Sequence, residues 1–230
     1  MTRLLHILSI ALITAGLVLF VEIGVTLAYK EPLSSIYASV QQGKAEDQLS
    51  ETEASFPSQA TERVVDRIRN RKLRIAALAR RFSNQVETGD AIGRIEADGM
   101  SLDAVVIQGT DTASLEKGPG HFPDTPFPGE GSTVGIAGHR TTYGAPFRNA
   151  DSMERGDRIV LEMPYATIAY RVQKTAIVDP SSVGVVRDVG YERLVLTTCH
   201  PLYSAEQRLI VFARAVEAQL DPRVQRARRS

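Results

Sequence analysis

The chain has 230 residues, a length that suits one compact domain with additional segments better than two full domains. Lysine and arginine total 27, and aspartate and glutamate also total 27, so the formal net charge is zero. This balance argues against a nucleic-acid-binding protein, whose affinity depends on clustered positive charge.

The first predicted element is an apolar segment at residues 4–28. It begins with LLHILSIALITAGLVLFV and is long enough for the roughly 20 residues that a bilayer requires. No small-x-small cleavage site follows it before Tyr29 and Lys30, which favours an uncleaved anchor over a signal peptide or a buried core helix. Arg3 and the amino terminus are positive, and the segment after the anchor is mainly acidic. The positive-inside rule therefore places residues 1–3 in the cytoplasm and the remainder outside the plasma membrane, as a single-pass protein.

Two segments of contrasting composition follow. Residues 29–62 are rich in Ser, Gln, Glu, Thr and Ala, which predicts an extracellular linker with little packed core, in part helical. Residues 63–90 carry apolar side chains near helical spacing among many arginines, which predicts a basic amphipathic helix. Such a helix either packs on the domain with its charged face in water or lies on anionic lipid headgroups.

Residues 91–218 show short β segments separated by turns, and six or seven strands at this spacing predict a mainly β domain. A closed or nearly closed barrel fits this pattern better than a βαβ sheet. Residues 219–230 form a polar, arginine-rich tail that we expect to fray. The expected strands are 93–97, 102–108, 133–139, 158–163, 166–178, 194–199 and 208–216, with short helical stretches at 112–116 and 148–153.

The single cysteine, Cys199, ends a strand-like run and precedes His200 and Pro201. A lone cysteine is often only a small buried hydrophobe. In an exported protein, however, an unpaired thiol suggests intermolecular pairing or reactivity, and a strand end is a common place for catalytic groups. Cys199 is therefore a candidate nucleophile.

A thiol nucleophile needs a base or ion-pair partner and donors for an oxyanion. His200 is a poor partner because neighbouring strand residues point to opposite faces, and His121 lies in a Gly/Pro-rich loop. His139, at the end of TVGIAGH, is the best spatial candidate because two strand ends can meet across a barrel. Among the arginines, side-chain period alone does not separate Arg208 from Arg214, since both fall on one face.

Three motifs, in order, resemble sortases. LVLTTCHPLYSAEQRLIVFA resembles the sortase cysteine signature followed by its arginine, GIAGHRTTYGAPF resembles the histidine region, and KGPGHFPDTPFPGEGSTVGIAGHR resembles the stretch that leads into it. The segments TCHP and HRTTYGAPF are most similar to those of actinobacterial class E sortases. The chain contains no tryptophan, so the Asp-Pro-Trp lid of pilin-polymerising sortases is missing.

The resemblance implies a sortase-type barrel of about eight strands without a cofactor or a metal that we can place. It implies Cys199 as nucleophile, His139 as general acid/base and Arg208 as the oxyanion-stabilising arginine. We also expect Tyr143 and Thr198 to contact substrate, Tyr143 by helping to select the second residue of the signal.

The implied reaction cleaves a Leu-Pro-x-Thr-Gly-like or Leu-Ala-x-Thr-Gly-like sorting signal between Thr and Gly through a thioester. The expected partners are surface proteins with a C-terminal sorting signal, the amine of a peptidoglycan precursor and the Gram-positive cell membrane. An exported thiol hydrolase that uses water as acceptor and a non-catalytic, membrane-tethered wall-binding β domain are the alternatives.

Overall fold

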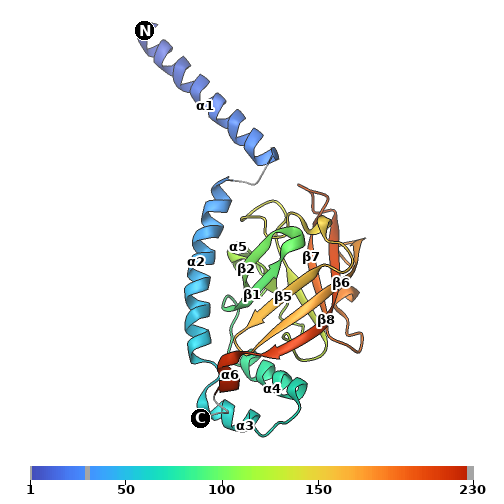
Figure 1. The fold of residues 1–230 in the computed structure, drawn as a ribbon. Coiled ribbons are helices and arrows are strands. Elements are labelled where there is room, and N and C mark those ends of the chain that lie inside the picture. Colours follow the sequence, from blue (N-terminus) through green and yellow to red (C-terminus); the bar gives the residue numbers. More distant parts are fainter. Residues whose placement is uncertain (1, 29–31, 227–230) are drawn as a thin grey trace.

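The protein, described by a computed structural model over residues 2–28 and 32–226, is built around a closed barrel of eight strands (Figure 1). Around the barrel the strands follow the order β1-β2-β3-β4-β7-β8-β6-β5, and β5 pairs with β1 to close it. The mainly β barrel expected from the sequence is confirmed. The strands are β1 (Ala91–Ala97), β2 (Leu102–Gln108), β3 (Gly120–His121), β4 (Thr133–Ala137), β5 (Arg158–Met163), β6 (Ala166–Val178), β7 (Arg193–His200) and β8 (Gln207–Leu220).

The pairing of β4 with β7 determines which strand ends meet. These two strands are parallel, with Ala137 opposite Thr197, whereas β7 and β8 are antiparallel neighbours joined by a short connection. The carboxyl ends of β4 and β7 and the amino end of β8 therefore lie at the same edge of the barrel. Strand β4 ends at Ala137, two residues before His139, so the expectation that His139 itself ends the strand is wrong.

Side-chain alternation along β7 separates the barrel interior from its outer surface. Leu194 and Leu196 belong to the main buried core, while Val195 belongs to a separate cluster with Ile210 and Phe212 of β8. Because successive strand residues point to opposite faces, Thr197 and Cys199 follow Val195 onto the outer side of the barrel.

The helices lie outside the barrel, with α1 and the start of α2 at one end of the molecule and α3, α4 and α6 at the other (Figure 1). Within α1, the 22 residues Arg3–Gly24 contain an 18-residue window with a mean hydropathy of 2.6, and the helix is long and apolar enough to cross a membrane. The helices are α1 (Thr2–Ala28), α2 (Pro32–Ser55), α3 (Gln59–Val65), α4 (Arg71–Ser83), α5 (Thr112–Lys117) and α6 (Pro222–Arg226), and short 3-10 turns are η1 (Asp98–Met100), η2 (Ala150–Ser152) and η3 (Val183–Val186).

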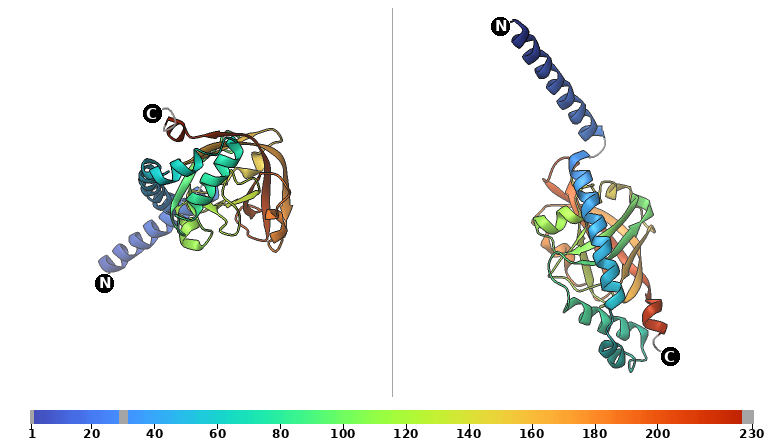
Figure 2. Two further views of the ribbon diagram at one scale, coloured as in Figure 1. Left: turned by 90° about the horizontal axis from the view of Figure 1, so that it is seen from below. Right: turned by 90° about the vertical axis from the view of Figure 1, so that its left-hand side faces the viewer.

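Helix α2 occupies most of the segment that we expected to be a linker with little packed core, and it lies along the outside of the barrel (Figure 2). Its Ala45 and Leu49 are buried against residues of β1 and β2. The Gln42 side chain accepts from the Val105 amide at 2.8 Å and donates to the Lys117 carbonyl at 2.7 Å. The polar composition of this segment therefore did not indicate a docked helix. Ala45 and Leu49 are enough to bury one face of α2, and Gln42 bonds to the backbone of β2.

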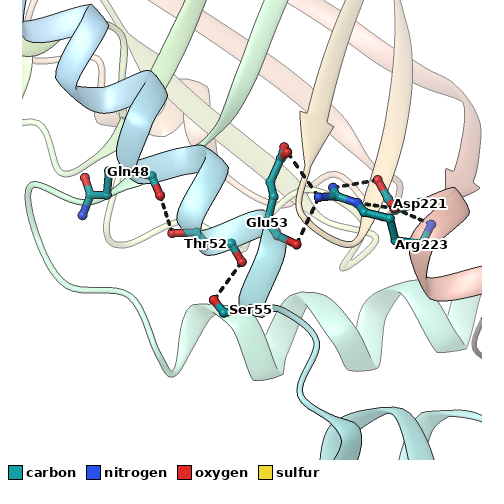
Figure 3. Close-up of polar contacts among 6 residues, drawn as sticks. All are labelled: Gln48, Thr52, Glu53, Ser55, Asp221 and Arg223. Carbon is teal, nitrogen blue, oxygen red and sulfur yellow. Dashed lines mark hydrogen bonds and ion pairs between the residues drawn. The ribbon is translucent and has the colours of Figure 1, made fainter.

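The carboxyl end of α2 is also fixed. Arg223 of α6 donates through Nη1 to the Glu53 carbonyl at 3.0 Å, pairs with the Glu53 carboxylate at 3.3 Å, and pairs with Asp221 at 2.8 Å (Figure 3). Helix α2 is thereby tied to the end of β8. Part of the tail that we expected to fray, residues 222–226, is helical, whereas residues 227–230 lie outside the described residues.

The basic segment contains the end of α3 and one complete helix, α4, which is shorter than the segment. Helix α3 ends at Val65, and Asn70 starts α4 by accepting a hydrogen bond from the Leu73 amide at 3.2 Å. The apolar face of α4, with Ile75, Leu78 and Phe82, is buried in the main core. The first of the two sequence-based interpretations, a helix packed on the domain, fits this placement.

Candidate active site

A cavity of about 520 Å³ lies on the outer side of the barrel at the edge where β4, β7 and β8 meet. Cys199, His139 and Arg208 all line it, so the structure brings together the three residues that the motifs single out. Apolar side chains form much of the remaining wall. They include Leu115, Phe122, Val178, Val183, Val185, Val186 and Ile210.

Cys199 and Arg208 face each other across two paired strands. They are direct partners in the antiparallel β7–β8 ladder, and directly opposed residues have Cβ atoms about 4.5–5.5 Å apart on the same face of the sheet. The guanidinium of Arg208 turns toward the connection between the strands, where Nη1 donates to the carbonyls of Ala205 at 2.9 Å and Gln207 at 3.0 Å. Those acceptors are exposed, so a ligand oxygen near the sulfur can compete for the same donors.

The second arginine on this face of β8, Arg214, lies far along the strand from Cys199 and Arg208. It is six residues beyond Arg208, a separation of about 20 Å along a strand. Its guanidinium stacks 4.4 Å from the ring centre of Tyr191, and Arg214 does not belong to the described residues that line the cavity. The structure therefore separates two arginines that side-chain period alone left equivalent.

His139 lies in a turn that begins after β4 and ends at Phe147, whose amide donates to the His139 carbonyl at 3.0 Å. A side chain at Gly138 would be only 2.7 Å from the Phe147 ring, so the tight closure of the turn requires glycine there. Tyr143 and Ala145 both have positive φ, at 49° and 46°. Non-glycine residues in this region are strained, and surrounding contacts must maintain the conformation.

Tyr143 supplies several of those contacts from the side of the turn away from the sulfur. Its ring packs 5.1 Å from that of His139, its hydroxyl donates to Glu116 Oε1 at 2.8 Å, and its amide donates to Ser34 Oγ at 3.0 Å. The Tyr143 side chain lies beside a second cavity of about 420 Å³ between α2 and the turn, and it is not among the described residues that line the Cys199 cavity. Its position suits support of His139 better than contact with a ligand beside Cys199.

The electrostatic setting of His139 combines two opposing effects. Burial lowers the pKa of the His139 imidazole, and the nearby Glu116 carboxylate raises that pKa in part. The Nε2 atom is buried and has no hydrogen-bond partner among the described residues. His139 as a residue lines the cavity, and an imidazole in such a position is the side chain that most often exchanges a proton with a ligand.

The other residues suggested by the sequence have structural partners. Thr198 is a buried residue of the cavity lining, and its hydroxyl donates to the Gly138 carbonyl at 2.7 Å, which ties β7 to the residue before His139. His121 of β3 is fully buried, bonded to Gln108 at 2.9 Å, and burial lowers its pKa to about 4. His200 accepts a bond from Arg140 at 2.9 Å and is not among the described residues that line the cavity.

Two residues near the site had no role in the sequence analysis, Glu116 and Arg140. Glu116, near the end of α5, precedes His139 by 23 positions, so no local pattern connects the two residues. Arg140 directly follows His139, and its side chain is almost fully buried. The only sequence signal for Arg140 is its adjacency to the motif histidine, because burial of an arginine is not visible in a sequence.

The closed barrel carries a thiol opposite an arginine, and a half-buried histidine lines the same cavity. The family model for the sortase domain matches residues 95–216, more than half of the chain, and the protein therefore belongs to the sortase family. The expected resemblance is confirmed.

Curated relatives include proteins of more than one sortase class. Sortase D of Bacillus subtilis is 34% identical over 134 residues, which cover 56% of this chain and 66% of that protein. Sortase SrtE1 of Streptomyces coelicolor is 36% identical over 92 residues, which cover 36% of this chain and 26% of that protein. The chain thus spans just under two thirds of the first relative and about a quarter of the second.

Solved sortase structures share the barrel. A Clostridium perfringens Sortase D5 transpeptidase superposes with a TM-score of 0.61 over 77% of this chain and 99% of that chain, at 23% identity, which is a likeness of fold alone. Sortase E1 of Streptomyces coelicolor with a tripeptide in its active site superposes with a TM-score of 0.55, at 27% identity, over 56% of this chain and 90% of that chain.

Proposed function

We propose that this protein is a membrane-anchored cysteine transpeptidase that joins proteins with a C-terminal sorting signal to an amine of the cell wall. The observation that carries the proposal is the shared position of Cys199, His139 and Arg208 on the wall of one cavity, with Cys199 directly opposite Arg208. Membership of the sortase family supports the same reaction.

The reaction has two covalent steps. The Cys199 thiolate attacks the threonine carbonyl carbon of a Leu-Pro-x-Thr-Gly-like or Leu-Ala-x-Thr-Gly-like signal, and Arg208 donates to the developing oxyanion. The Thr–Gly bond breaks as protonated His139 gives its proton to the leaving glycine amine, which leaves a thioester on Cys199. An acceptor amine then attacks the thioester carbonyl, loses a proton to His139, forms a new amide and releases the Cys199 thiolate.

The cavity wall suits such a signal. Beyond the sulfur it is formed largely by valine, leucine, isoleucine and phenylalanine side chains, with the η3 turn at Val183–Val186 on one side. An apolar wall favours an apolar anchor residue, and the first residue of the proposed signal is leucine. Val183 is 77% exposed, so this wall has apolar surface available for a ligand.

The proposed location follows from α1 and α2. We propose that residues 4–28 span the plasma membrane with residues 1–3 in the cytoplasm, and that residues 91–218 form the catalytic domain outside. Ser34, six residues after the end of α1, accepts a hydrogen bond from Tyr143 in the His139 turn. Six residues reach at most about 21 Å, so the anchor holds the catalytic cavity near the bilayer, where tethering raises the effective concentration of membrane-held substrates.

The full-length protein in detergent micelles, incubated with each signal peptide and triglycine, tests the proposal. We expect a peptide–triglycine product by mass spectrometry and, without triglycine, a transient thioester on Cys199. A product ending in a free threonine carboxylate at the same rate with and without triglycine would instead indicate the hydrolase. Absence of any thioester on an alkylatable Cys199 would favour the non-catalytic wall-binding domain. The Cys199→Ala variant is the control for background cleavage.

A further inference from the structure

The residue that follows His139, Arg140, has a nearly fully buried guanidinium beside the end of β7. Its Nη1 is shared between Nδ1 of His200 at 2.9 Å and the carbonyl oxygen of Cys199 at 3.4 Å. Its Nε donates to the Arg148 carbonyl at 3.3 Å, and its Nη2 pairs with Asp151 at 2.8 Å. Four of the five N–H donors of one side chain are thus used on two segments, the end of β7 and residues 148–151.

These contacts connect the two walls of the cavity. Arg140 is covalently joined to His139, and it holds the backbone of Cys199 and the ring of the next residue, His200. The side chain therefore reaches from the histidine turn to the strand end that carries the sulfur. A burial of 97% is expensive for a permanently charged group, and one carboxylate that is itself 58% exposed offsets the cost only in part.

We propose that Arg140 is a positioning residue that sets the distance between His139 and Cys199. The inference rests on the proposed function, because it concerns the geometry of that reaction. The planar fork of arginine can serve the Cys199 carbonyl, His200 and the Arg148 carbonyl at once, whereas the point charge of lysine has fewer donors in less fixed directions. Displacement of reacting groups by about 1 Å can cost about 10²-fold in rate.

The chain offers a matched control in Arg74 of α4. This residue is buried to the same degree, 4% exposed against 3% for Arg140. Its side chain pairs with Asp66, and its Nη2 also bonds a backbone carbonyl, that of Val224. Helix α4, which contains Arg74, lies at the end of the molecule opposite α1 and the start of α2 (Figure 1), and Arg74 does not belong to the described residues that line the Cys199 cavity. Loss of buried arginine contacts as such should affect both variants, whereas loss of positioning should affect only Arg140.

The experiment compares full-length Arg140→Lys and Arg74→Lys in detergent micelles, with the better of the two signal peptides and triglycine. We expect kcat of Arg140→Lys to fall about 100-fold with KM within about twofold, because the apolar walls that bind the peptide are untouched. We expect Arg74→Lys to lower the melting temperature and leave kcat within about twofold. Equal kcat values in the two variants, or a loss in Arg140→Lys that only tracks its melting temperature, would overturn the proposal.

Amide hydrogen exchange provides a readout that needs no substrate. We expect peptides covering 197–203 to exchange at least about tenfold faster in Arg140→Lys and at the normal rate in Arg74→Lys. If neither signal peptide is turned over by the unaltered enzyme, the proposed signal is wrong, and unchanged exchange in Arg140→Lys would separately reject the positioning role.

A second pair of variants decides the matter if Arg140→Lys does not fold. His200→Asn keeps an acceptor for Arg140 near the position of Nδ1, whereas His200→Leu removes it. We expect His200→Asn to retain kcat within about threefold and His200→Leu to lose about tenfold, with equal KM values. Equal kcat values for these two variants would contradict the role that we assign to the bond between Arg140 and His200.

Discussion

The two walls of the Cys199 cavity are held in different ways. On one wall, Cys199 and Arg208 are direct partners in a ladder of backbone hydrogen bonds between β7 and β8. On the other wall, His139 lies in a strained turn whose conformation depends on side chains of α2 and α5, through Ser34 and Glu116. We therefore expect the geometry of the strand wall, which carries Cys199 and Arg208, to be insensitive to changes in distant elements. The geometry of the histidine wall, which carries His139, should depend on them.

The largest effect should come from the histidine itself. His139→Ala removes the proposed acid/base, which typically contributes 10²–10⁴-fold, and we expect kcat/KM to fall about 10³-fold. His200 is the matched control because it is adjacent to Cys199 but bonded to Arg140, and His200→Asn should stay within about threefold. Steady-state kinetics with one signal peptide decides this, and an equally severe loss in His200→Asn would show that the wrong histidine was assigned.

The strand wall provides the next test. Arg208→Ala and Arg208→Lys should each lower kcat by about 10²–10³, since one oxyanion donor is typically worth that much and lysine lacks the planar fork. Arg214→Ala should change kcat by less than about twofold, because this residue stacks on Tyr191 away from the cavity. Measured kcat values in the reverse order would mean that Arg214 is the functional arginine.

The same contrast explains how far the sequence predicted the site. The positions of Cys199 and Arg208 follow from strand alternation and a short connection between neighbouring strands, which a sequence pattern contains. The role of Tyr143 as a support for His139 depends on contacts with Glu116 and Ser34, 27 and 109 positions away. Such contacts follow from how α2 and α5 dock on the barrel, and no local periodicity predicts that docking.

The barrel itself was predictable because alternating apolar residues and turns mark its strands. The packing of α2 on the barrel was not predicted because its composition is polar, and its buried face includes small residues such as Ala38 and Ala45. Most residues of α2 are polar, because they face water or, like Gln42, bond to the backbone of β2. Burial of Arg74 and Arg140 was equally invisible, since arginines ordinarily indicate a solvated surface.

Truncation of α2 tests whether the histidine wall depends on that helix. A chain that begins at Pro32 keeps the contact of Ser34 with Tyr143, whereas one that begins at Gln59 loses α2 entirely and exposes Val105 and Ile107. We expect the longer chain to keep the kcat of the full-length protein toward a soluble peptide. The shorter chain should lose roughly tenfold in kcat and melt at a lower temperature.

The rate of Cys199 alkylation separates the two walls in that experiment. The hydrogen bonds of α2 reach β1, β2, α5, α6 and the His139 turn. Alkylation of the shorter chain by iodoacetamide should therefore stay within about twofold of the normal rate at a temperature where it is folded. A shorter chain with full kcat would show that α2 does not order the His139 turn.

The smallest expected effect concerns the charge of Glu116. This carboxylate raises the pKa of His139 against the lowering by burial, so Glu116→Gln should lower the His139 pKa further. An imidazole ordinarily titrates about two units below a thiol, and the acid limb of the kcat/KM profile then follows the histidine. The reactive form pairs a thiolate with a protonated histidine, and a lower histidine pKa makes this form rarer.

We therefore expect Glu116→Gln to move the acid limb of kcat/KM to lower pH and to reduce the plateau rate by the same factor, a few-fold at most. Gln keeps an oxygen that can accept from the Tyr143 hydroxyl, so the bond found at 2.8 Å can persist without the charge. Tyr143→Phe is the complementary variant, since it removes the bond and keeps the charge, and it should lower kcat without moving the limb. Its preference between the Leu-Pro and Leu-Ala peptides should also be unchanged, because the ring supports His139 and does not line the cavity. A limb that moved in Tyr143→Phe and not in Glu116→Gln would mean that the hydrogen bond, and not the carboxylate charge, controls the protonation of His139.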